Sequence, residues 1–228
     1  MKKTLFAALV MFLLFASVCF GEQTINVAGN GVVQIEPDTA TVKLGVEVTR
    51  KTAEDAQKDN AKIMQDVVLA VSKLGVPKDK IQTAGFYIWP ETKYEQNQPA
   101  KTVGYRCSNQ LSIIVEDLAK VSKVIDSGIG AGANNVQGLQ FLRKDDAEAK
   151  RVALDKAVKD AAEKARAIAT AAGVKIKGIK SITESGAVTP LPLMDNAVRA
   201  MAVGGAETPV SPGLLEVRGS VTISYSFE

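Results

Sequence analysis

The side chains that carry out most enzyme chemistry are sparse in this sequence. Its 228 residues include no histidine, which excludes histidine-based triads, Cys–His dyads and imidazole zinc sites. The sequence also lacks a GxSxG elbow, a Ser-x-x-Lys pair, an EF-hand pattern and a phosphate loop ending in GK and Ser or Thr. We therefore expect no enzyme activity, and we predict no catalytic, cofactor-binding or metal-ligating residue and no cofactor.

Carboxylates and a glycine-rich run could still carry chemistry. Glu54 and Asp55 are adjacent, but they lie where the first turn of a helix is expected, and acidic side chains there stabilise the helix dipole. The run Gly128–Gly138 has the composition of a nucleotide loop. Nucleotide loops follow a strand and open a helix. This run instead follows an expected helix and precedes a strand, so we interpret it as a turn.

Cys107 is the only cysteine outside the first 21 residues, so it cannot form a disulfide within the remaining chain. It alternates in step with Val103, Tyr105 and Leu111, which predicts a buried thiol on the apolar face of a strand. The alternative is a redox-active or cross-linking thiol, which needs exposure and a cationic neighbourhood. Arg106 is adjacent in sequence but is expected to point to the opposite face.

Three aromatic residues cluster where a strand meets Pro90 and a polar segment. They are Tyr87, Trp89 and Tyr94. Aromatic side chains at a strand end can form a platform for a ligand, or they can close the end of a hydrophobic core. The sequence leaves both interpretations open.

Residues 1–21 have the pattern of a secretory signal peptide, since two lysines precede the apolar run Leu5–Phe20 and small residues follow. We expect cleavage after Gly21 and export to the periplasm; the alternatives are a retained membrane anchor or a lipid on Cys19. Removing the two lysines leaves 26 basic residues against 25 acidic ones, so nucleic acid is not an expected partner. No later stretch is long and apolar enough to span a bilayer, which allows a membrane association only at the surface.

Apolar residues at every second position predict strands. We expect these strands at residues 24–28, 32–36, 40–49, 80–89, 102–115, 136–142, 175–183 and 217–227. Two long helices are predicted after Thr52 and Asp145, and a short one after Asp117. The fold class is α+β, an antiparallel sheet with two long helices and one short helix packed against it. A helix followed by glycine and a strand occurs at Gly75 and again at Gly173, which indicates either two related lobes or chance.

The segment 186–213 combines chain breakers with apolar residues, because it contains four prolines and a glycine pair among leucines and methionines. Such a long segment inside a domain is usually functional or disordered. It can be a passive crossover between two strands. It can also be an apolar arm that orders on a partner or a neighbouring subunit.

Six short motifs spread over the chain resemble those of the SIMPL-domain family of bacterial envelope proteins. They are Val27–Gly31, Glu36–Thr41, Ile81–Phe86, Gly104–Asn109, Gly132–Asn135 and Pro212–Val217. The resemblance covers residues 22–228, which we interpret as one SIMPL-like domain containing the arm at 186–213. Physically, these motif residues are expected to serve structure, with Gly29 and Gly31 permitting a tight turn.

The resemblance implies a location in the periplasm or at the outer membrane and no established enzymatic activity. It also implies assembly into hollow, channel-like oligomers and a link to oxidative-stress tolerance, and no catalytic residue can be transferred from it. We therefore expect a non-catalytic envelope protein that forms a homo-oligomer or binds another envelope protein. The alternatives are a small-molecule-binding periplasmic protein and a thiol-based redox protein that uses Cys107.

Overall fold

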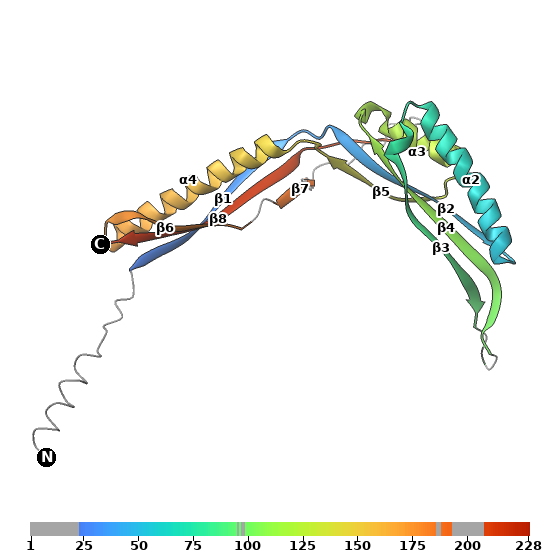
Figure 1. The fold of residues 1–228 in the computed structure, drawn as a ribbon, viewed down its shortest axis with the longest axis horizontal. Helices are drawn as coiled ribbons and strands as arrows, with labels where there is room; N and C mark the ends of the chain where they lie inside the picture. The colour runs from blue at the N-terminus through green and yellow to red at the C-terminus, as the bar shows by residue number, and fades with distance from the viewer. Residues whose placement is uncertain (1–22, 95, 97–98, 186–187, 193–207) are drawn as a thin grey trace, which may run out of the picture. The chain divides into compact units, whose positions relative to one another are not determined.

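A computed structural model describes residues 23–94, 96, 99–185, 188–192 and 208–228 (Figure 1). The expected signal peptide at residues 1–21 lies outside these ranges. The described residues form two compact units. Unit 1 contains residues 23–31, 154–185 and 219–228, and unit 2 contains residues 32–153, 188–192 and 208–218.

Unit 2 contains a β-α-β-β-α-β succession of elements. These elements are β2 (Thr39–Arg50), α2 (Ala53–Lys73), β3 (Ile81–Lys93), β4 (Lys101–Val115), α3 (Val121–Gly130) and β5 (Asn135–Leu142). The four strands form one sheet in the order β3-β4-β2-β5, and every neighbouring pair is antiparallel. This is the split β-α-β, or ferredoxin-like, arrangement.

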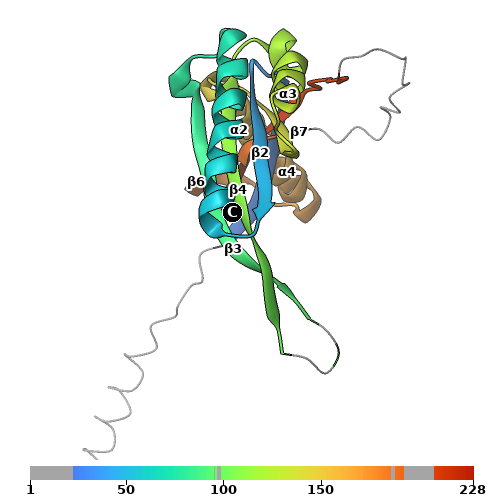
Figure 2. The ribbon, with the colours of Figure 1, turned by 90° about the vertical axis from the view of Figure 1, so that its right-hand side faces the viewer.

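One face of this sheet carries the core of unit 2. Figure 2 shows α2 lying over β2 and β4, and apolar residues of both helices pack with Val42, Leu44 and Leu111. The register pairs Val42 with Ile113 on one side and with Leu139 on the other. The apolar residues of β2 therefore lie on the face that the helices cover, and the polar residues that alternate with them lie on the open face.

The helix starts follow the predicted caps. The Thr52 side chain accepts a hydrogen bond from the backbone N–H of Asp55 at the start of α2. Asp117 accepts one from Ala119 in the short 3-10 turn Leu118–Lys120 that precedes α3. The α+β class and the presence of two long helices and one short helix are confirmed.

Three elements run through both units, namely β1 (Thr24–Ile35), α4 (Ala147–Ala172) and β8 (Leu215–Phe227). The second sheet has the order β1-β8-β6, with β6 at Ile176–Glu184, and β7 (Val188–Pro192) also pairs with β8. Within unit 1, α4 lies along β1 and β8 (Figure 1) and packs there through small residues. These are Ala157, Ala161, Ala165 and Ala169.

The expectation of a tight turn at Gly29 and Gly31 is wrong. The chain continues as one strand from Thr24 to Ile35, and neither glycine has a positive φ. Gly29 is needed for a different reason: a Cβ atom there would lie 2.0 Å from the backbone oxygen of Ala157. A side chain is absent so that α4 can contact the strand directly.

The described parts of the arm at 186–213 contact other elements of the fold. Its first described part is β7, which is antiparallel to β8 even though it contains Pro190 and Pro192. At its other end the Thr208 hydroxyl donates to the Asp126 carboxylate of α3 at 2.6 Å, and Val210 packs on the core of unit 2. Residues 193–207 lie outside the described ranges, so the choice between a passive crossover and a partner-binding arm stays open.

Candidate functional site

The open face of the sheet in unit 2 carries Tyr87 and Trp89, two of the aromatic residues singled out in the sequence. Cys107 faces the helices, and its neighbour Arg106 points to the opposite, uncovered face, as predicted. The pairing of Trp89 with Arg106 places the aromatic residue beside this guanidinium.

Arg106 joins three strands on the open face. Its two terminal nitrogens donate to Glu47 of β2 and to Glu91 of β3, each at 2.8 Å. The hydrogen bond with Glu91 is the largest contribution that raises the pKa of Arg106, and the charge of Glu47 raises it further. All three side chains remain about one-third exposed, so the cluster fixes a guanidinium at the surface and contains no free acid–base pair.

The neighbouring aromatic side chains are exposed. Tyr87 is 60% exposed and Trp89 is 40% exposed, and Tyr87 leans over Gly85, where a Cβ atom would lie 3.0 Å from its ring. Tyr94 is further out on the same hairpin and is 80% exposed. The interpretation that these residues close the end of a core is therefore wrong. Their strand is at the sheet edge, where it also tolerates Pro90 and continues to Lys93.

Cys107 is buried in the core. Its side chain is inaccessible to solvent, and burial raises the pKa of the thiol. Its carbonyl oxygen accepts a hydrogen bond from Asn60 of α2, which also donates to the carbonyl oxygen of Val46. The prediction of a buried thiol is confirmed, and a neutral thiol of this kind is a poor nucleophile.

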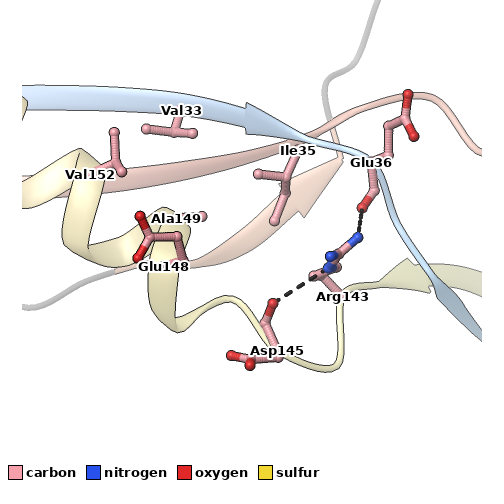
Figure 3. A pocket seen from close by; sticks show the side chains of 8 residues that line it. All are labelled: Val33, Ile35, Glu36, Arg143, Asp145, Glu148, Ala149 and Val152. Carbon is pink, nitrogen blue, oxygen red and sulfur yellow. Dashed lines mark hydrogen bonds between the residues drawn. The ribbon is translucent and has the colours of Figure 1, made fainter.

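A hollow of about 390 Å³ lies beside the start of α4 (Figure 3). Its apolar wall includes Val33, Ile35 and Ala149. The Arg143 guanidinium borders it and donates to the backbone oxygens of Glu36 and Asp145, at 3.3 and 3.4 Å. These bonds link the segments on the two sides of the hollow. The guanidinium therefore has a structural role.

Asp145 and Glu148, two of the acidic side chains around this hollow, also have structural partners. One oxygen of Asp145 accepts from the N–H of Ala147, the first residue of α4. Glu148 pairs with Arg151, with one contact at 2.9 Å, and this hydrogen bond lowers the pKa of Glu148. The hollow therefore combines an apolar wall with Arg143, Asp145 and Glu148, whose side chains already take part in hydrogen bonds.

The described residues contain no group of three or more histidine, cysteine or acidic side chains able to hold a metal ion. Within the same ranges, no helix is both long and apolar enough to cross a membrane. The glycine run behaves as expected, because α3 ends at Gly130 and β5 begins at Asn135.

Sequence reasoning did not identify the Arg106 cluster as a unit. Alternation placed Arg106 and Glu47 on polar strand faces, but only the register of three strands shows that they meet Glu91. The ion pair of Asp160 with Lys164 was also missed, although their spacing of four residues on a helix is a readable signal.

Together these features define an α+β protein of two compact units, in which the polar clusters described above form hydrogen bonds and ion pairs within the fold. A family model described as "SIMPL: Protein of unknown function (DUF541)" matches residues 25–225. The chain belongs to the SIMPL family.

Named relatives agree with this assignment. The chain is 30% identical over 210 residues to the 26 kDa periplasmic immunogenic protein of Brucella melitensis biotype 1. This match covers 90% of this chain and 84% of the relative. It is 24% identical over 143 residues to the uncharacterized protein YggE of Escherichia coli K12. This second match covers 61% of this chain and 58% of that protein. Neither name describes a catalysed reaction.

Proposed function

We propose that this protein is a non-catalytic component of the bacterial envelope that works by assembling with itself, and that strand β3 provides the contact. The observation that carries this proposal is the exposure of aromatic side chains on both faces of one edge strand. Phe86 is 46% exposed on the helix-covered side, while Tyr87 and Trp89 are 60% and 40% exposed on the open side.

Two physical properties of β3 favour a protein partner. An edge strand presents unpaired backbone groups that can bond to another chain. Contiguous apolar groups at a surface favour burial against a partner, and aromatic side chains contribute large contact areas. β3 combines both properties over Ile81–Lys93, at the edge of the order β3-β4-β2-β5.

The periplasm is the compartment we propose. The pattern of residues 1–21 favours export, and the Brucella relative is named as periplasmic. A role in oxidative-stress tolerance, if this chain shares it, would then depend on assembly. The burial and raised pKa of Cys107 argue against direct thiol chemistry.

A second candidate function rests on the same face. Trp89 and Tyr87 lie beside the fixed Arg106 cluster, so they could instead form a platform for a flat small molecule with polar edges. A ligand of this kind would change the fluorescence of Trp89, which is the only tryptophan in the chain. Assembly would instead appear as a change in particle size.

The test is sedimentation velocity of the mature chain over a range of concentrations. We expect a particle larger than one chain, and we expect the double variant Tyr87→Ser, Trp89→Ser to sediment as a smaller species. The matched control is Ile179→Ser, Ile182→Ser, because these residues are each 54% exposed on the edge strand β6 of the other sheet. A parent that is monomeric at every concentration, or an equal response of both variants, would contradict the proposal.

A further inference from the structure

The strand β1 lies at the edge of its sheet, but part of its outer backbone is already bonded. Among the residues that the structure describes, the order β1-β8-β6 gives it a strand neighbour on one side only. On its other side the N–H of Asn30 donates to the Asp160 carboxylate at 2.8 Å. The carbonyl oxygen of Ala28 accepts from the Lys164 ammonium at 3.0 Å. Both bonding side chains come from α4.

These two side chains supply what a neighbouring strand would supply. A strand added at this edge would offer an acceptor to the N–H of Asn30 and a donor to the carbonyl of Ala28. Asp160 is that acceptor and Lys164 is that donor. They are also bonded to each other at 2.7 Å, four residues apart on one helix face, which holds both in position.

The close approach of α4 makes this arrangement possible. The residue between the two bonded groups is Gly29, and a Cβ atom there would lie 2.0 Å from the backbone oxygen of Ala157 and 2.7 Å from the Cβ of Ala161. The helix backbone is therefore in contact with the strand. At this distance the short side chain of Asp160 reaches the strand backbone.

The ion pair is only partly exposed, since the side chains of Asp160 and Lys164 retain 34% and 46% of their accessible surface. An ion pair on an open helix surface contributes little to stability. This pair instead bonds to backbone groups that lie 130 and 136 residues away in sequence. Its bonds to the backbone of Ala28 and Asn30 indicate a role other than helix stabilisation.

We propose that Asp160 and Lys164 form a plug that closes the outer edge of β1 to strand addition by a second copy of this chain. Natural proteins protect sheet edges with charged side chains and covering helices, and this plug combines both devices. The proposal does not depend on assembly through β3, because it concerns a different edge in a different unit.

The chain offers a matched control for this plug. Asp155 and Lys159 also form a four-residue-spaced ion pair on α4, at 2.7 Å. Their side chains are 58% and 70% exposed, and their hydrogen bond joins the two side chains to each other. Replacing either pair by alanines removes the same charges and similar helix-surface interactions, but only one replacement uncovers β1.

The experiment compares the mature parent chain with D160A/K164A and D155A/K159A. Sedimentation velocity over a concentration series measures association, and hydrogen exchange measures protection of the Asn30 amide. For D160A/K164A we expect a new, concentration-dependent species larger than the parent particle. At the lowest concentration, where this species has dissociated, we expect roughly tenfold faster exchange at Asn30, because its N–H has then lost one hydrogen bond. For D155A/K159A we expect the parent's behaviour in both measurements.

Circular dichroism establishes that each variant is folded. If D160A/K164A does not fold, Lys164→Met replaces it, because methionine keeps an aliphatic side chain and removes the donor to Ala28. Unchanged sedimentation and unchanged Asn30 exchange in the folded plug variant would overturn the proposal. Equal association of D155A/K159A would also overturn it, because lost charge alone would then explain the effect. A monomeric parent would contradict assembly through β3 and leave this comparison intact.

Discussion

The contact between Gly29 and α4 can be tested by adding one methyl group. In Gly29→Ala the new Cβ would lie 2.0 Å from the backbone oxygen of Ala157 and 2.7 Å from the Cβ of Ala161. Neither atom can rotate away, so helix and strand must separate. Separation would loosen the packing of the α4 alanines on β1 and β8 in the core of unit 1.

Overpacking a well-filled site costs about 1–3 kcal/mol, and the upper end applies where backbone must move. In a chain of this size each kcal/mol of lost stability lowers Tm by roughly 2–4 °C. We therefore expect Gly29→Ala to melt roughly 6–12 °C below the parent. Far-UV circular dichroism follows both units during heating, while the fluorescence of Trp89 follows unit 2.

The control is Gly178→Ala in β6, which belongs to the same sheet. A Cβ atom at Gly178 would meet no atom within 4 Å, so we expect a change within about 0.5 kcal/mol. The circular dichroism transition of Gly29→Ala should fall by more than its Trp89 transition. If Gly29→Ala melts with the parent, or if both glycine variants lose the same stability, the close approach does not constrain this fold.

Three further outcomes are expected. Thr52→Ala should lower the free energy of unfolding by about 1 kcal/mol, measured by urea denaturation, because the N–H of Asp55 loses its cap; an unchanged midpoint would contradict this role. Cys107→Ala should cost about 1 kcal/mol for one buried heavy atom and leave particle size unchanged, while a bulky thiol reagent should label the native parent slowly; rapid labelling would refute burial. Asp160 has a pKa below its ordinary value of 3.8, through the hydrogen bond from Lys164 and then that from Asn30. Its contribution to stability is therefore complete at neutral pH and lost as the pH falls through the lowered pKa, so the Asn30 amide resonance should shift only below about pH 4; a shift near pH 5 or above would show that the carboxylate is not held this way.

Much of the fold could be predicted because its signals are local. Alternating residues predicted β2 and β8, and the caps Thr52 and Asp145 predicted where two long helices begin. The turns after α2 and α4 were also readable, since Gly75 and Gly173 have φ values of 88° and 71°. Each of these features depends on residues only a few positions apart.

Gly29 shows where local reasoning fails. Glycine and asparagine in alternation are typical of a turn, yet Val27–Gly31 lies inside one continuous strand, Thr24–Ile35. The reason is a helix backbone more than one hundred positions later, whose approach leaves no room for a side chain. The same limit applies to Pro190 and Pro192, which lie in β7, because proline is compatible with a strand when its missing N–H is not needed by the ladder.

For Cys107 and Arg106, too, the local features could be predicted from the sequence and the contacts between distant segments could not. Strand parity correctly placed Cys107 in the core and Arg106 on the opposite face. It could not show that Arg106 meets Glu47 and Glu91, since this requires the register of β2, β3 and β4. The face on which a side chain lies follows from its position along one strand. Its partners on neighbouring strands depend on how those strands are aligned.

The backbone bonds of Asn134 and of Asp160 with Lys164 follow one chemical rule. Asn134 lies immediately before the first residue of β5. Its side-chain amide accepts a hydrogen bond from the N–H of Glu47 and donates one to the carbonyl oxygen of Glu47, each at 2.8 Å. One amide suffices because both backbone groups belong to one residue. On β1 the N–H and the carbonyl belong to Asn30 and Ala28, so two side chains share the task. An acid supplies the acceptor and a lysine the donor, and their mutual attraction holds them together over the strand.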